Sequence, residues 1–164
     1  MNAPSPDAVT GPATFFEDYP VGRRMRHKRG KTIDELEGVL LTNLCVNTAQ
    51  AHFNEDSQKH QPVGTRIVFG GVTASVVIGL ASQDASENLV RDIGLRTMKL
   101  ARPVVHGDTV YAFTEVVSAT PIDDGLGEIV FHHWGRNQDD QTVFEADRIV
   151  HVRRRPAAVT AEES

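Results

Sequence analysis

The chain has 164 residues, of which 40% are hydrophobic and 24% are charged. This length can build one ordinary hydrophobic core, and it is too short for two well-buried domains. The formal net charge of −5 argues against a nucleic-acid-binding protein, because such proteins are usually basic.

Cys45 is the only cysteine, which excludes an intrachain disulfide and a four-cysteine zinc site. We interpret Cys45 as a small buried apolar residue. A lone cysteine also fits a reducing compartment, so we expect a cytoplasmic protein. No run reaches the roughly 18 apolar residues of a membrane span, and the start lacks the basic and apolar segments of a signal peptide. We therefore expect no contact with a membrane.

The two ends of the chain differ in composition from the middle. Residues 1–13 are rich in Pro, Ala and Gly, and the residues after Pro156 are similar. We therefore expect a flexible N-terminal arm over 1–13, one domain over 14–156 and a flexible tail over 157–164.

The first predicted helix begins with a capping box. In this pattern the Thr32 hydroxyl accepts from the backbone N–H of Glu35, and the Glu35 carboxylate reaches back. The helix is expected to end near Asn47, and its apolar residues share one face. They are Ile33, Leu36, Val39, Leu40 and Leu44. A short second helix is expected over 54–59.

Residues 72–85 are apolar on nearly every side. The run is long, it follows a glycine pair, and its small residues recur at near-helical spacing. These features favour a helix over a buried strand. A helix that is apolar all round has to be enclosed, for example by a sheet wrapped around it.

The second half of the sequence predicts strands. Strand-like segments run over 94–104, 109–119, 127–137 and 142–153. Turn signals separate them at His106-Gly107-Asp108, Asp123-Asp124-Gly125 and Asp139-Asp140. Helices followed by consecutive hairpins indicate an α+β domain with an antiparallel sheet. The expected fold class is therefore a single hotdog, an antiparallel sheet wrapped around a long central helix.

Three stretches of the sequence occur in an order and spacing that resemble a known family. They are Asn47–Phe53 (NTAQAHF), Val68–Gly71 (VFGG) and Pro103–Thr109 (PVVHGDT). Together they resemble the MaoC-like dehydratases, which are hotdog (R)-specific enoyl-CoA hydratases, and within that group the mesaconyl-CoA hydratase (β-methylmalyl-CoA dehydratase) branch. The resemblance runs from about Phe15 to Arg155. It implies hydration of a short 2-enoyl-CoA thioester, or the reverse dehydration, without a cofactor, because coenzyme A enters as part of the substrate.

The resemblance implies that His52 carries the chemistry. The family usually has an Asp and a His five positions later, and here the earlier position is Asn47, which cannot act as an acid or base. An imidazole titrates near about 6.5. We therefore expect His52 to remove a proton from the water that attacks C3 and to return a proton at C2, while the Asn47 amide holds that water. The alternatives are a surface histidine and a helix-capping asparagine.

The resemblance also assigns a site for the negative charge that develops on the thioester oxygen. Gly70 matches the family's oxyanion glycine, and Gly71 follows it at the start of the predicted central helix. Backbone N–H groups at a helix start are unpaired and favour negative charge. Phe69 stands where the family more often has His. The alternative is that the two glycines only turn the chain into the helix.

Other polar residues are weaker candidates. A mesaconyl substrate carries a free carboxylate, for which Arg66 is the nearest cation in sequence, with Arg23, Arg24 and Arg91 as alternatives. Glu55 and Asp56 are candidates for orienting His52. Asp84 is a candidate for a second catalytic carboxylate, but we favour its interpretation as a helix-surface charge. Adjacent strand residues such as His132 and His133 point to opposite faces, so we expect no metal site.

Two further functions remain open at this point. A hotdog thioesterase needs a carboxylate near the thioester, and the first two turns of the predicted central helix offer none. A non-catalytic acyl-CoA or acyl-carrier binding module would explain Asn47 as a sign of lost activity. In each case we expect an acyl-CoA ligand and a homodimer or higher homo-oligomer. The site of this oligomer is expected between the Asn47–His52 loop of one subunit and the Gly70-Gly71 turn of the other, or close to it.

Overall fold

The computed structural model describes residues 6–9, 11 and 14–156. The strands are β1 (Asp7–Val9), β2 (Arg24–Thr32), β3 (Leu89–Leu100), β4 (Thr109–Pro121), β5 (Leu126–Arg136) and β6 (Thr142–Arg153). The helices are α1 (Glu35–Leu44), α2 (Glu55–Gln58) and α3 (Gly70–Ala85), with 3-10 turns η1 (Phe16–Asp18) and η2 (Gln50–His52). No helix in this described part of the chain is long and apolar enough to cross a membrane.

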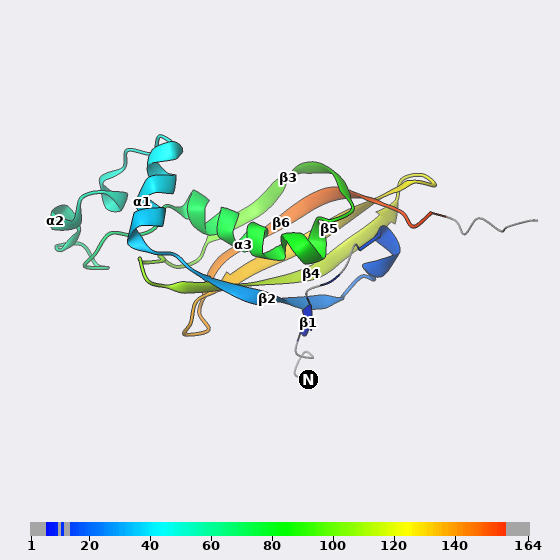
Figure 1. Cartoon of the computed structure of the whole chain (residues 1–164), viewed down its shortest axis with the longest axis horizontal. Coiled ribbons are helices and arrows are strands. Elements are labelled where there is room, and N and C mark those ends of the chain that lie inside the picture. The colour runs from blue at the N-terminus through cyan, green and yellow to red at the C-terminus, as the bar shows by residue number, and fades with distance from the viewer. Residues whose placement is uncertain (1–5, 10, 12–13, 157–164) are drawn as a thin grey trace, which may run out of the picture.

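The strands form one sheet in the order β1-β2-β4-β5-β6-β3. The short strand β1 pairs parallel to β2, and every other pair of neighbours is antiparallel. Helix α3 lies across one face of the sheet, while α1 and α2 gather at one end of the molecule (Figure 1). The predicted α+β class and the long helix over 72–85 are confirmed.

Helix α3 packs closely against the middle of the sheet. Val77 is fully buried, and a Cβ at position 135 of β5 would overlap its side chain, so only glycine fits there. The opposite side of the helix is open, because Ser75, Gly79 and Ser82 are exposed. The sheet of the described chain therefore covers α3 on one side and does not enclose it.

The start of α1 differs from the prediction. The N-cap is Asp34, whose side chain accepts from the N–H of Glu37 at 2.8 Å, so the predicted capping box is wrong. Thr32 ends β2, and its hydroxyl instead pairs with the hydroxyl of Thr109 at 2.7 Å. Because Thr32 is the last residue of β2, its side chain does not cap the helix.

The predicted apolar face of α1 is mostly uncovered. Ile33 is buried, but Leu36 is 79% exposed, and Leu40 and Leu44 are also exposed. Cys45 is exposed as well, so its interpretation as a buried residue is wrong. The three leucines are not covered by the described chain, because α1 stands at the end of the sheet.

Two strand predictions need correction. Strand β2 was not expected, because its sequence RMRHKRGKT is strongly basic, and only Met25 and His27 in it are buried. Strand β3 starts at Leu89 and does not form a hairpin with β4. It lies at the far edge beside β6, while β4 lies between β2 and β5. The β4–β5 and β5–β6 hairpins are present as predicted.

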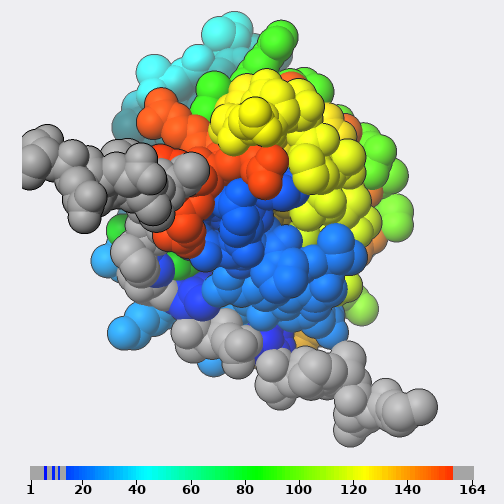
Figure 2. All heavy atoms as spheres, turned by 90° about the vertical axis from the view of Figure 1, so that its right-hand side faces the viewer, coloured from blue at the N-terminus to red at the C-terminus, as the bar shows by residue number. Residues whose placement is uncertain are grey.

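The end of the molecule away from α1 brings the first and last described segments together. Figure 2 shows residues near the start of the domain beside the end of β6 and the β4–β5 turn. Arg154 pairs with Glu17 at 3.0 Å, and Arg155 pairs with Asp18 at 2.7 Å. These ion pairs close the end of the sheet.

The expected flexible ends fall mostly outside the structure. Residues 1–5, 10, 12–13 and the tail 157–164 lie outside the described residues. Residues 7–9 of the expected arm form β1 beside β2. The domain limits 14–156 stay a prediction.

A chain of buried polar groups connects α3 to three strands. His27 donates from Nδ1 to the carboxylate of Asp84 at 2.8 Å, and its Nε2 lies 2.7 Å from the hydroxyl of Thr114. That hydroxyl lies 2.7 Å from Nδ1 of His133, whose Nε2 is buried without a partner among the described residues. Asp84 is itself buried and accepts from the N–H of Gly11, so its interpretation as a helix-surface charge is wrong.

Burial sets the protonation of both histidines. Desolvation lowers the pKa of His27 although Asp84 opposes it, and it holds the pKa of His133 well below the ordinary value of 6.5. Both rings are therefore neutral in the folded chain near pH 7. An unfolded histidine takes up a proton as the pH falls through about 6.5, so the unfolded state then binds more protons.

We predict that the free energy of unfolding falls as the pH drops from 7.5 to 5.5. Each buried histidine contributes a slope of at most about 1.4 kcal/mol per pH unit. The variant His133→Gln keeps a polar group beside Thr114 but cannot titrate, so its slope is smaller than that of wild type. Urea unfolding at several pH values measures this. The exposed His60→Gln is the control, and equal slopes for the two variants would contradict the prediction.

Candidate active site

A cavity of about 400 Å³ opens beside the start of α3. Its lining comes from the segment after α1, the first turn of α3 and the chain that follows β3. The lining residues are Asn47, His52, Ile67, Val68, Phe69, Gly70, Thr73, Leu100, Ala101, Arg102, Pro103 and Val104. Most of these side chains are apolar, so the few polar groups among them define where a ligand is oriented.

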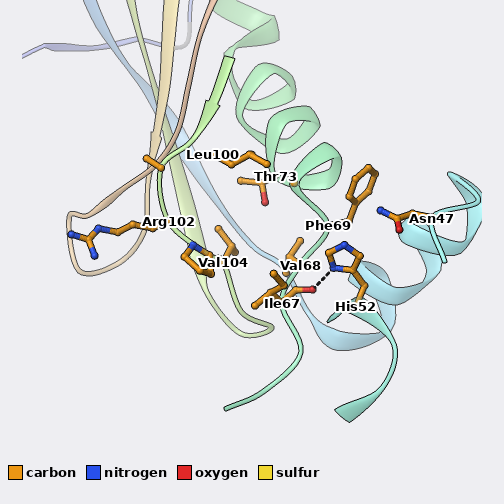
Figure 3. A pocket seen from close by; sticks show the side chains of 12 residues that line it. Asn47, His52, Ile67, Val68, Phe69, Thr73, Leu100, Arg102 and Val104 are labelled. Carbon is orange, nitrogen blue, oxygen red and sulfur yellow. Dashed lines mark hydrogen bonds between the residues drawn. The ribbon is translucent and has the colours of Figure 1, made fainter. Parts of the chain in front are cut away.

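His52 has a fixed orientation in this cavity (Figure 3). Its side chain is buried, and Nδ1 lies 2.8 Å from the carbonyl oxygen of Ile67. A carbonyl can only accept, so Nδ1 carries the proton and Nε2 of the neutral ring is left with a free lone pair. The His52 ring also contacts Phe69, with 5.6 Å between the ring centroids. The alternative of a surface histidine is wrong.

Asn47 reaches the same end of the cavity through a strained turn. Helix α1 ends at Leu44, and Val46 then adopts a left-handed backbone with φ of 55°. A β-branched residue rarely takes this conformation, which costs roughly 1–3 kcal/mol. The left-handed residue that follows α1 is therefore Val46, and Asn47 does not serve as this cap.

The Asn47 amide is used on one side only. Its Oδ1 accepts from the N–H of Ala49 at 3.0 Å. Its Nδ2 donates to no group among the described residues. Figure 3 shows the Asn47 amide near the His52 ring and Phe69. The amide therefore presents two N–H donors at the end of the cavity where the imidazole lies.

The two glycines begin α3 as predicted. Gly70 lines the cavity, and a Cβ there would overlap Leu100. The N–H groups of Gly70 and Gly71 find no acceptor within the described residues, because the first bonds of the helix come from Val72 and Thr73 to Phe69. This helix start therefore offers two free donors and the positive end of the helix dipole.

Arg66 does not line the cavity. Its Nε lies 3.0 Å from the carboxylate of Glu55, and its guanidinium also pairs with Glu35. The backbone N–H of Arg66 donates to Glu55 as well, and this bond is the main cause that holds the pKa of Glu55 below its ordinary value. Arg66 therefore ties α2 and α1 to the segment before α3.

The acidic candidates near His52 do not contact it. Glu55 is occupied by Arg66, and Asp56 pairs with Lys59 at 3.1 Å. The group that orients His52 is instead the Ile67 carbonyl. The alternative cations Arg23, Arg24 and Arg91 do not line the cavity either.

Sequence reasoning missed the opposite wall of the cavity. Thr73 lies three residues after Gly70, so helical spacing alone would have placed it on the same face. Leu100 and Arg102 gave no such signal, because β3 was not known to end beside the glycine turn. Asn47 and Gly70 of one chain line the same cavity, and the expected site between the loop of one subunit and the turn of the other stays a prediction.

The buried group of Asp84, His27 and Thr114 has the connectivity of a carboxylate–imidazole–hydroxyl triad. Thr114 is fully buried, however, so a substrate cannot reach its hydroxyl. His133 is buried on the inner face of the sheet and His132 pairs with Asp147 on the outer face, which confirms their predicted opposite directions. In the described part of the chain, no three His, Cys, Asp or Glu side chains gather as metal ligands.

Comparison with known proteins identifies related sequences. The sequence pattern of the mesaconyl-CoA hydratase family matches residues 16–154. The mesaconyl-CoA hydratase of Haloarcula hispanica is 34% identical over 132 residues, which cover 79% of this chain and 36% of that protein. The chain therefore spans well under half of the length of this relative.

Solved structures give the same result for the fold. The crystal structure of a MaoC domain protein dehydratase from Chloroflexus aurantiacus superposes with a TM-score of 0.82 at 26% identity, over 90% of this chain and 46% of that one. A Mycobacterium tuberculosis protein with a double hotdog fold superposes with a TM-score of 0.71 at 20% identity, over 92% of this chain and 48% of that one. These likenesses confirm the predicted hotdog fold.

We predict that Arg66 holds the loop of Asn47 and His52 in place. In the variant Arg66→Gln, both ion pairs are lost, so amide hydrogen exchange over residues 47–58 accelerates by about threefold to tenfold while α3 and β5 stay unchanged. Glu35→Gln removes only the more exposed pair and serves as the control with a smaller effect. Unchanged exchange of the loop in Arg66→Gln would refute this role.

Proposed function

This chain belongs to the mesaconyl-CoA hydratase family, and from that membership we propose that it is a hydro-lyase for a short 2-enoyl-CoA thioester. The observation that carries the proposal is the orientation of His52. Its Nδ1–H is held by the Ile67 carbonyl, so Nε2 is the free acceptor in the cavity. An imidazole held in this way is suited to exchange a proton with water near neutral pH.

The proposed reaction needs one titrating group. His52 takes a proton through Nε2 as water attacks C3 of the enoyl group, and the protonated ring then returns a proton at C2. Asn47 positions the water through Nδ2, because its Oδ1 is already occupied by Ala49. Water adds across the double bond without a change in redox state, so the step requires no cofactor.

The negative charge of the enolate is proposed to fall on the thioester oxygen at the start of α3. The free N–H groups of Gly70 and Gly71 and the dipole of α3 both favour an anion there. Glycine at position 70 also lets the carbonyl approach the backbone closely. The thioester would then lie between Gly70 and His52, which line the same cavity.

The lining of the cavity favours hydration over thioester hydrolysis. A hotdog thioesterase needs a carboxylate near the thioester carbonyl, and none of the lining residues is Asp or Glu. The free lone pair that His52 presents in the cavity likewise favours an enzyme over a binding module. Mesaconyl-CoA, or β-methylmalyl-CoA in the reverse direction, is the substrate that we propose, and a cytoplasmic location stays a prediction.

We predict that the protein hydrates mesaconyl-CoA and that His52→Ala lowers kcat by about 10²- to 10⁴-fold. Asn47→Ala keeps the base but loses the donor to water, so a smaller loss, on the order of tenfold, is expected. The assay follows loss of enoyl absorbance together with free thiol, for mesaconyl-CoA and crotonyl-CoA.

The exposed His60→Ala is the control and keeps wild-type activity. Thiol release in place of hydration would show a thioesterase. A His52→Ala variant that hydrates as fast as wild type would exclude the proposed mechanism.

We further propose that two copies of the chain pair through β3. This strand is hydrogen-bonded to β6 on one side only and lies at the end of the sheet order. Every residue of β3 after Leu89 is exposed, including several large apolar ones. An open and partly apolar edge strand is a template for pairing with another chain.

We predict that the protein in solution has twice the 18.0 kDa mass of one chain. Ile93 in β3 is 44% exposed, and Ile93→Lys puts a charge into the proposed interface and shifts the mass toward one chain. Val117→Lys in β4 is a matched control, because Val117 is 45% exposed but lies away from β3. Light scattering after size-exclusion chromatography measures the mass, and a wild-type monomer at all concentrations would refute the pairing.

A further inference from the structure

The cavity has one polar end and one charged end. Asn47 and His52 lie at one end, and Arg102 lies at the opposite end, with Leu100 and Thr73 between them (Figure 3). Arg102 is the only charged residue among those that line the cavity. A ligand that fills the whole cavity therefore extends from the His52 imidazole to residue 102.

Arg102 has a fixed backbone and a free side chain. On one side the N–H of Ala101 donates to the carbonyl of Val143, and on the other the carbonyl of Val104 accepts from the N–H of Val68. These bonds hold the segment in place at both ends. The guanidinium makes no ion pair or hydrogen bond with any described residue, and Figure 3 shows it directed away from the other lining side chains.

Arg66, the cation expected from sequence, is already neutralised by Glu55 and Glu35, and only 15% of its side chain is exposed. Arg102 is exposed and has no such partner. A guanidinium that has no partner in the described chain and belongs to a residue lining a mostly apolar cavity is suited to bind a carboxylate or phosphate through two parallel hydrogen bonds.

We propose that Arg102 binds an anionic group of the thioester substrate at the end of the cavity opposite His52. This proposal rests on the proposed function. Two parts of the substrate carry such a group: the free carboxylate of a dicarboxylic acyl chain, and the phosphates of coenzyme A. Arg102 is thus a substrate-binding residue, and His52 remains the group that exchanges the proton.

The test measures binding of unreactive, saturated thioesters to wild type and to Arg102→Gln by titration calorimetry. The four ligands are methylsuccinyl-CoA, butyryl-CoA, methylsuccinyl-pantetheine and butyryl-pantetheine, which carry both anionic groups, the phosphates only, the carboxylate only, or neither. Loss of a charged hydrogen bond raises Kd by about 10- to 100-fold. Arg153→Gln is the control, because Arg153 is exposed on β6 and does not line the cavity.

Each outcome decides the proposal. Weaker binding of the two methylsuccinyl ligands alone supports the carboxylate as the partner of Arg102, and weaker binding of the two CoA ligands alone supports the phosphates. Equal binding of all four ligands by wild type and variant overturns the proposal. Weaker binding of butyryl-pantetheine to the same degree as the others also overturns it, because Arg102 would then only shape the cavity.

These measurements separate the inference from the proposed function. They use no turnover, so a wild-type protein that binds the thioesters but hydrates none of them would refute the hydro-lyase while the role of Arg102 is still decided. A wild-type protein that binds none of the four refutes both.

Discussion

The packing of α3 against the sheet is the constraint on which the rest of the structure depends. Val77 lies so close to β5 that only glycine fits at position 135, and this contact fixes the distance between helix and sheet. Interiors pack to crystal-like density, so such a contact leaves little freedom to slide. Both ends of the helix are then placed by one interface. The N-terminal end faces the cavity, and the C-terminal end places Asp84 beside His27.

The polar groups at the two ends of α3 differ in what they can do. At the C-terminal end, Asp84, His27 and Thr114 satisfy one another in the core, so they make the helix position unique but are closed to ligands. At the N-terminal end, the donors of Gly70 and Gly71 are left without acceptors. The loop that faces them is held by the bond from His52 to Ile67 and carries a strained Val46. Strain of this kind persists only where surrounding contacts over-determine the backbone.

Sequence patterns predicted the elements whose side chains have a regular period. Helix α3 and strands β4, β5 and β6 were found, and so were Asn47, His52, Phe69 and Gly70 as neighbours of one site, through their resemblance to a family. Strand β2 was missed because its inward residues are Met25 and His27, so no alternation of apolar residues marks it. The start of α1 was misplaced because Thr32 satisfies its hydroxyl across the sheet, at Thr109. The spacing of residues along one segment of the sequence does not show which strand this segment pairs with.

The same limit explains why the sequence pointed to Arg66 and gave no signal for Arg102. Proximity along the chain favoured Arg66, whereas Arg102 reaches the cavity only because β3 lies at the far edge of the sheet and ends beside Gly70.

Strand β3 links the proposed dimer interface to the candidate active site. Its pairing with β6 has three register irregularities, and Thr97 within it has a left-handed backbone, so the ladder of hydrogen bonds to β6 is interrupted. A side-chain contact adds to the pairing of β3 with β6. The buried Arg148 of β6 donates two hydrogen bonds, of 2.6 and 2.7 Å, to the carboxylate of Asp92 in β3. The open edge of β3 and the wall of the cavity from Leu100 to Val104 are consecutive in the chain. A partner that pairs with this edge therefore lies next to the segment that carries Arg102, so the assembly and the charged end of the cavity share one part of the chain.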